Sequence, residues 1–484
     1  MEIEQNREAN NAVGARFTRV FYVVLIFMLS SCTPSLLKSP EELDFNSLEF
    51  TFPQAEKVTL ANGMEVYLLE DRELPLFRIS ALIRTGSIYE PDDKAGLAEL
   101  TGVVMRTGGT QSMTGDEINT QLEFIAGSVE TGIGREVGSA SLSTLKKDMD
   151  LSLKIFADVL MHPVFAEEKV DLARKKKEEE IRRRNDDPQN IAFREFRKLL
   201  FPDNPRGRVP TLKTIATITR EDMVAFHRKY FHPNNIILGI SGDFKREEII
   251  PRIKELFKEW DSQGGPLPDV ALPEKNKETR VHYAYKDLPQ SVIVVGHRVV
   301  NKAHPDFFPF KVLNFILGGE GFNSRLTSEI RSNLGLAYSV GSFYRAEVDY
   351  GFFGAYCFTK SDSTAKCISL ISEIIGNVQK EGISRKELEW AKNSILNNFI
   401  FEFTSSARIV GREIAISYDK LPKEFLEIYR ERIAEVTVED VNRVAQKYLH
   451  PDRMVVVVVG NSRSFDRPLS EFGEVTVIPL EETY

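Results

Sequence analysis

Histidine is the side chain best suited to ligating a metal ion or carrying a proton at neutral pH. The chain has seven: His162, His227, His232, His282, His297, His304 and His450. A zinc-binding helix needs two histidines at positions i and i+4, so that both rings lie on one face. No two of the seven have that spacing, and the chain contains neither a nucleophile elbow nor a Ser/His/Asp motif. The residues alone therefore predict no self-sufficient hydrolytic site.

Carboxylates that could hold a cation are concentrated in the stretch KKKEEEIRRRNDDP. Each of Glu178, Glu179 and Glu180 has a basic residue four positions before it and another four positions after it. For Glu180 these are Lys176 and Arg184. Because i,i+4 pairs of opposite charge stabilise exposed helices, we expect a solvated ion-pair helix here.

Length and composition predict a soluble protein built from two large domains. The chain has 484 residues, 42% of them apolar and 28% charged. Its net charge of -8 argues against nucleic acid as a partner, because binding phosphates requires a basic surface.

A single long apolar run lies near the start of the chain, in RFTRVFYVVLIFMLSSCTPS. Residues 21–29 are too few to span a bilayer, which takes about twenty residues, and Arg16 and Arg19 precede them. The run therefore predicts a signal peptide over residues 1–32, with a short transmembrane anchor as the alternative. The residues up to Cys32 resemble a bacterial lipobox, in which the cysteine becomes the lipid-carrying N-terminus.

The two remaining cysteines are Cys357 and Cys367. A disulfide between them is possible in an oxidising compartment, but the pattern favours two buried thiols that act as small apolar side chains.

An internal repeat divides the chain into two halves. The stretch TREDMVAFHRKYFHPNNIILGISG begins at Thr219, and TVEDVNRVAQKYLHPDRMVVVVVG begins 218 residues later at Thr437. Eight residues, including a threonine, an Asp and a His-Pro pair, recur in register, which indicates domain duplication. Each threonine, with an aspartate three residues on, predicts a capped helix start. The duplicated His232 and His450 are expected to be structural, at the ends of these helices.

Each half opens with strands, continues through long helical stretches and ends in a buried strand. This order predicts an α+β fold of two tandem domains, each with a mostly antiparallel sheet and helices on one face. Residues 261–278, DSQGGPLPDVALPEKNKE, are rich in Gly, Pro and charge and are predicted to be the linker.

Four stretches together resemble the pitrilysin or insulinase family of zinc peptidases, which includes the mitochondrial processing peptidases. They are RTGSIYEPDDKAGLAEL, EEIRRRNDDP, NPRGRVPTLKTIATITREDMVAFHRKYFHPNNIILGISGDF and LNFILGGEGFNSRLTSEIRSNLGLAYSV. The resemblance implies two α/β-sandwich-like domains in a clamshell arrangement. We place them at residues 50–260 and 279–465.

In that family a His-x-x-Glu-His helix follows Gly-Leu-Ala and binds zinc. Matching Gly96 to Ala98 puts Glu99, Gly102 and Val103 at the three motif positions. The resemblance places the third zinc ligand at Glu180. Glycine and valine offer no donor atoms, and two carboxylates alone would hold a hard cation only weakly. We therefore expect no metal in this chain and regard Glu180 as a relic.

The resemblance also implies a substrate-binding pair in the second half, an arginine and a tyrosine seven residues apart. EIRSNLGLAYSV supplies both, as Arg331 and Tyr338. Tyrosine can donate to a developing oxyanion, and arginine can hold a peptide carbonyl or carboxylate. Family members that work as pairs of different chains divide the zinc ligands and this pair between them.

The resulting hypothesis is a lipoprotein subunit that lacks its own zinc and pairs with a zinc-bearing homologue to cleave peptides or unfolded proteins. Peptide is expected to lie extended along a sheet edge. The lipid on Cys32 is expected to anchor the chain at the periplasmic face of the outer membrane. The alternative is a non-catalytic peptide-binding or scaffold protein of the same fold.

Overall fold

A computed structural model describes residues 54–480, apart from 262, 263, 266, 275–277 and 320. The signal-peptide and lipobox predictions, with Cys32, lie outside the described residues. The described residues form one compact unit. No helix in the described part of the chain is both long enough and apolar enough to cross a membrane.

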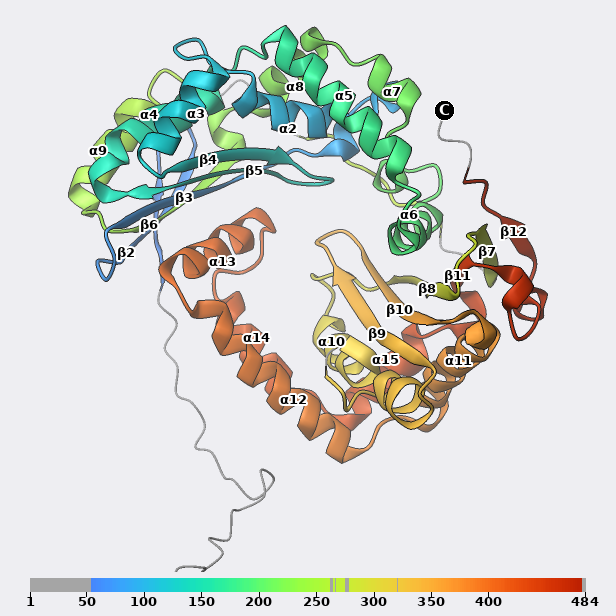
Figure 1. Cartoon of the computed structure of the whole chain (residues 1–484). Helices are drawn as coiled ribbons and strands as arrows, with labels where there is room; N and C mark the ends of the chain where they lie inside the picture. The colour runs from blue at the N-terminus through green and yellow to red at the C-terminus, as the bar shows by residue number, and fades with distance from the viewer. Residues whose placement is uncertain (1–53, 262–263, 266, 275–277, 320, 481–484) are drawn as a thin grey trace, which may run out of the picture. The chain divides into compact units, whose positions relative to one another are not determined.

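The first half is built on a six-stranded sheet with the order β1-β2-β6-β3-β5-β4 (Figure 1). Its strands pair antiparallel, except that β2 and β6 run parallel. Burial alternates along β3, the pattern of a strand with one face in the core. The strands are β1 (Glu56–Thr59), β2 (Glu65–Glu70), β3 (Leu76–Ile83), β4 (Ser128–Ile133), β5 (Gly138–Leu145) and β6 (Ile236–Gly242).

The second half repeats this sheet with the order β12-β7-β11-β8-β10-β9. The parallel pair β7 and β11 stands where β2 and β6 stand in the first sheet. The edge strand β12 also runs parallel to β7, whereas β1 runs antiparallel to β2. The matching orders confirm the α+β two-domain fold. β12 lies beyond residue 465, and the described residues of 261–278 hold no helix or strand. The strands are β7 (Arg280–Tyr285), β8 (Gln290–Val299), β9 (Ala337–Ala346), β10 (Gly351–Lys360), β11 (Val455–Gly460) and β12 (Val475–Val477).

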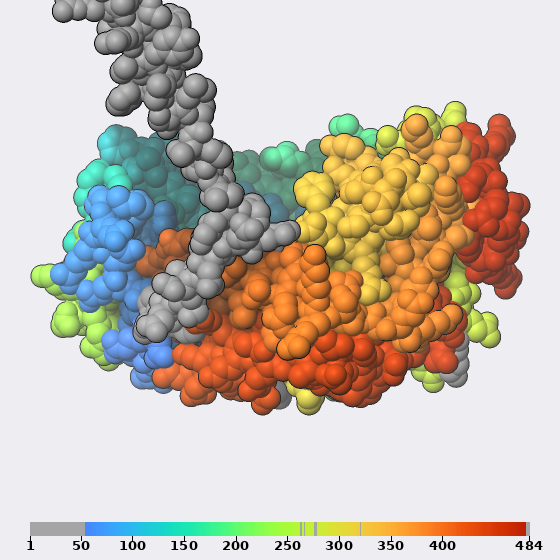
Figure 2. Space-filling view, turned by 90° about the horizontal axis from the view of Figure 1, so that it is seen from below, coloured from blue at the N-terminus to red at the C-terminus, as the bar shows by residue number. Residues whose placement is uncertain are grey.

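Helices of each half cover one face of its sheet. Figure 2 shows one surface of the molecule, part of which is formed by the orange-to-red helices of the second half. Both predicted capping boxes are present, at Thr219 with Asp222 and at Thr437 with Asp440. The first-half helices are α2 (Leu97–Thr107), α3 (Gly115–Phe124), α4 (Met149–Met161), α5 (Glu167–Arg183), α6 (Pro188–Leu200), α7 (Leu212–Ala216), α8 (Arg220–Tyr230) and α9 (Arg246–Leu256). The second-half helices are α10 (Phe307–Asn314), α11 (Thr364–Glu381), α12 (Arg385–Phe399), α13 (Ser406–Tyr418), α14 (Phe425–Glu435) and α15 (Val438–Tyr448).

Two equivalent helices are exchanged between the halves, so the prediction of helices on one face of each sheet was incomplete. α6 packs on β8 and β11 of the second sheet, and α13 packs on β2, β3 and β6 of the first. A Cβ on Gly239 of β6 would lie 2.3 Å from a methyl of Val410, and one on Gly296 of β8 would lie 2.8 Å from the ring of Phe196. Glycine in each sheet therefore makes room for the helix of the other half.

The duplicated histidines have structural surroundings, but their contacts differ from the predicted helix caps. His232 is buried, and its Nδ1 contacts the side chain of Asn234. The backbone N–H of His450 donates to Nε2 of His297. Cys357 and Cys367 are both buried free thiols in this structure. The hydrogen bond with the Cys367 thiol, and after it burial, raises the pKa of Cys357.

Candidate functional site

Helix α2 carries the three positions at which the sequence predicted a degenerate metal motif. It begins after Gly96, whose φ of 104° is in the left-handed region that favours glycine. The carboxylate of Glu90 accepts from the backbone N–H groups of Gly96 and Ala98, both at 3.0 Å. The first turn of α2 is thus fixed by a buried acid, which favours the positive end of the helix dipole.

Burial raises the pKa of Glu90 to about 7, because desolvation outweighs the two backbone hydrogen bonds. In the unfolded chain the same group releases its proton near pH 4.5. Between these values the folded chain holds a proton that the unfolded chain has lost, so stability falls as pH rises through this window.

We expect Glu90→Gln to remove about 3 kcal/mol of that pH dependence. Urea unfolding at pH 4.5 and pH 7.5 gives the change in unfolding free energy between these pH values for each protein. The difference between the changes of parent and variant is the contribution of Glu90. An equal change in unfolding free energy with pH for the variant and the parent would show that folding does not raise the pKa of Glu90.

Gly102 of α2 lies against edge strand β4. A Cβ at this position would stand 2.4 Å from the backbone nitrogen of Ile133 and 2.8 Å from the carbonyl carbon of Gly132. The hydroxyl of Thr131 donates to the carbonyl oxygen of Gly102 at 2.7 Å. The backbone of β4 therefore occupies the space that a side chain at position 102 would need.

Lys177 of α5 joins two of the predicted positions, Glu99 and Glu180. Its ammonium lies 2.8 Å from the carboxylate of Glu99 and 2.9 Å from that of Glu180. The lysine side chain is 10% exposed, whereas the two glutamates are 45% and 65% exposed. Burial pulls the pKa of Lys177 down, but the two carboxylates more than offset it and the net shift is upward. The ammonium is therefore charged and fills the position between the two carboxylates.

The ion-pair helix was predicted correctly in type but partly wrongly in its pairs. Glu178 does pair with Arg182, at 3.6 Å. Glu180 pairs with Lys177, however, and Arg184 donates to the carbonyl oxygen of Pro210. The reason is tertiary: α5 packs on α2, and this brings Glu99 to the face that carries Lys177.

Arg331 and Tyr338, the pair predicted to bind substrate, lie side by side in the second half. The guanidinium of Arg331 lies over the ring of Tyr338 at 5.7 Å and over that of Phe322 at 5.0 Å. Tyr338 is 83% exposed, and its hydroxyl has no hydrogen-bond partner among the described residues. Arg331 is likewise in no ion pair within the described part of the chain. Tyr338 is thus presented to solvent, and Arg331 beside it is half-buried.

A β-bulge in the edge strand β9 accounts for the exposure of Tyr338. Ala337 pairs with Thr359 of β10, and Ser339 pairs with Phe358, so Tyr338 is the extra residue between them. A bulge redirects a side chain at a sheet edge and is common beside active sites. This local feature was not predicted from the sequence.

Comparison with known proteins decides the family. A model described as insulinase, peptidase family M16, matches residues 67–211, and a second, described as the peptidase M16 inactive domain, matches residues 217–395. An uncharacterized zinc protease of Mycobacterium leprae is 27% identical over 403 residues, which are 81% of this chain and 89% of that protein. The chain belongs to peptidase family M16.

Solved structures show the same architecture. A peptidase M16 inactive domain from Pseudomonas fluorescens superposes with a TM-score of 0.78 at 25% identity, over 84% of this chain and 98% of that one. A protease from Helicobacter pylori gives a TM-score of 0.77 at 22% identity, over 84% and 99%, and supports the fold alone.

Zinc does not fit the M16 motif positions of this chain. Glu99 and Glu180 already share one ammonium, Gly102 has no room for a side chain, and Val103 has no donor atom. Among the described residues, no group of three or more His, Cys, Asp and Glu side chains is placed to hold a metal ion. A structural or catalytic zinc site takes at least three protein ligands. In this chain, the ion pairs of Lys177 with Glu99 and Glu180 occupy the place of the motif's metal ion.

Proposed function

We propose that this M16 chain is a non-catalytic subunit that completes the active site of a separate, zinc-bearing homologue. The observation that carries the proposal is the Lys177 ammonium held between Glu99 and Glu180. It places a fixed positive charge where an active subunit needs an exchangeable metal ion. Zinc is therefore expected in the partner and not in this chain.

The pair Arg331 and Tyr338 in the second half supports a role in substrate binding. Tyr338 has a free hydroxyl that can donate to the oxyanion formed when a peptide carbonyl is attacked. Arg331 has three donor nitrogens and no carboxylate partner in the described residues, so it can take a peptide carbonyl or carboxylate. The aromatic contacts hold its guanidinium in place without neutralising it.

The substrates are expected to be peptides or unfolded proteins in extended form. β9 is an edge strand, and an edge presents unpaired backbone groups to an added strand. Recognition through main-chain hydrogen bonds selects for an extended backbone more than for any one side chain.

The chain is proposed to act at a membrane surface. Residues 1–32 carry the signal-peptide pattern, and a lipid on Cys32 would hold the protein at the periplasmic face of the outer membrane. This part of the proposal depends on the sequence alone.

A scaffold or peptide-binding protein with no peptidase partner is the second candidate. The close contact between Gly102 and β4 fits a scaffold and a partner subunit equally well, because neither kind of protein binds zinc. Arg331 and Tyr338 favour the partner subunit, since a scaffold has no need of a cation beside a hydroxyl when neither has a polar partner among the described residues.

Peptide cleavage by this chain, by a zinc-bearing homologue and by their mixture tests the proposal. We expect the mixture to cleave an unfolded peptide substrate at a rate well above that of either chain alone. Cleavage by this chain alone, abolished by a chelator, would contradict the proposal. A mixture no faster than the homologue alone would favour the scaffold.

A further inference from the structure

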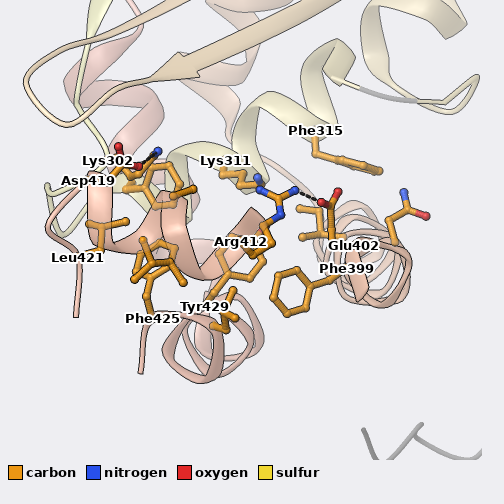
Figure 3. A pocket seen from close by; sticks show the side chains of 16 residues that line it. Lys302, Lys311, Phe315, Phe399, Glu402, Arg412, Asp419, Leu421, Phe425 and Tyr429 are labelled. Atoms are coloured by element: carbon orange, nitrogen blue, oxygen red, sulfur yellow. Dashed lines mark hydrogen bonds and ion pairs between the residues drawn. The ribbon is translucent and has the colours of Figure 1, made fainter. Parts of the chain in front are cut away.

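A partly open pocket of about 270 Å³ lies in the second half, among α10, α12, α13 and α14 (Figure 3). Aromatic rings from three of these helices form its walls, among them Phe307, Phe399, Phe425 and Tyr429. Neither Arg331 nor Tyr338 lines it, so it is separate from the proposed substrate-binding pair.

Three cations and two carboxylates reach this apolar pocket, and one cation has no carboxylate partner among the described residues. Lys302 pairs with Asp419 at 2.5 Å, and Arg412 pairs with Glu402. Within the described part of the chain, the contact of the Lys311 ammonium is the face of the Tyr429 ring, whose centroid lies 5.1 Å away. Figure 3 shows the Arg412 guanidinium in the middle of the pocket, between Lys311 and Glu402.

The Lys311 side chain lies where this pocket meets a second hollow. The second hollow, of about 620 Å³ and lined by β9 residues, shares Lys311 and Arg412 with the pocket. A negatively charged group at this junction would contact both cations, while an attached apolar group would fill the aromatic chamber. Burial already lowers the pKa of Arg412, so a counter-charge here would act in a partly desolvated setting.

We propose that the pocket binds an organic carboxylate with a compact aromatic or branched apolar group. Lys311 and Arg412 hold the carboxylate, and the rings of Phe307, Phe399 and Phe425 enclose the apolar group. Pockets of this kind, apolar with a few convergent polar groups, are typical small-molecule sites. This inference goes beyond the proposed function and does not depend on it.

The same chemistry could come from a free aryl carboxylate or from the C-terminal residue of a peptide. Two probes separate these sources: 3-phenylpropanoate, and acetyl-Ala-Ala-Phe with a free carboxylate. The source whose probe binds more tightly is the one that the pocket is built for. The matched neutral probes are 3-phenylpropanamide and the C-terminal amide of the tripeptide.

Tryptophan fluorescence of the full chain can report binding. Trp390 lies 5.0 Å from the ring of Phe315, which lines the pocket. The only other tryptophan of the chain, Trp260, is replaced by phenylalanine so that the signal comes from Trp390. We expect a saturable change with the carboxylates, and binding at least about tenfold weaker with the amides, because a charge-assisted hydrogen bond is lost.

Lys311→Met is expected to weaken carboxylate binding by about ten- to a hundredfold, and Lys311→Arg is expected to retain most of it. The matched control is Lys386→Met, which removes an exposed lysine from α12 without touching the pocket lining. Circular dichroism checks that each variant is folded. If the methionine variant is not, the comparison of each carboxylate with its amide on the parent chain tests the proposal. No saturable binding of either carboxylate, equal binding of the amides, or unchanged binding by Lys311→Met would overturn the proposal.

Discussion

Replacing Tyr338 with phenylalanine is expected to lower kcat of the mixed enzyme by about a hundredfold to a thousandfold, the usual cost of losing one oxyanion donor. The substitution removes only the hydroxyl. The ring stays under the Arg331 guanidinium, so the local packing and the charge are retained. A loss confined to kcat would indicate an interaction made mainly in the transition state.

Tyr285→Phe is the matched control for this prediction. Tyr285 is a partly exposed tyrosine of β7 whose hydroxyl has no hydrogen-bond partner in the described residues. It lies at the other side of the second sheet, separated from β9 by three strands. Its loss is expected to leave kcat unchanged. If Tyr338→Phe were as active as this control, Tyr338 would have no catalytic role and the scaffold function would be favoured.

Gly102→Ala is expected to destabilise the chain by about 2–3 kcal/mol, as is usual for overpacking in a core. The added methyl would meet the backbone of β4 at 2.4 Å, and backbone cannot move aside as the end of a side chain can. Gly411→Ala on α13 is the control, because a Cβ there meets nothing within 4 Å. That variant should gain about 0.5–1 kcal/mol from the better helix former.

Urea unfolding of both variants checks this prediction. The triple variant Glu99→His, Gly102→Glu and Val103→His rebuilds the motif in sequence, but we expect it to bind no stoichiometric zinc. β4 fills the space of the new glutamate, and the Lys177 ammonium remains beside Glu180. Zinc binding by the rebuilt motif would show that α2 and β4 separate easily. An unaffected Gly102→Ala would show the same.

The internal repeat predicted the two-domain fold because a duplicated sequence must build two similar sheets. It did not predict the exchange of α6 and α13, since the apolar face of a helix does not say which sheet it covers. The helical pattern likewise gave Glu180 two basic neighbours on its own helix, Lys176 and Arg184. The actual arrangement depends on the approach of α2 to α5, which places Glu99 beside Lys177.

Among the site residues, too, some features could be predicted from the sequence and others depend on packing. Glu99, Gly102 and Val103 could be identified from the sequence because the motif has fixed spacing. The closeness of Gly102 to β4 could not, because it depends on how helix and strand pack. The bulge at Tyr338 is a shift of strand register, which no residue type in that stretch indicates.

The zinc content of the purified chain, measured by elemental analysis after dialysis against metal-free buffer, tests the central claim most directly. Because an ammonium sits between Glu99 and Glu180 and the other two motif positions offer no ligands, we predict no stoichiometric zinc. Stability should also be unchanged by a chelator. One equivalent of tightly bound zinc, lost together with stability on chelation, would contradict the account.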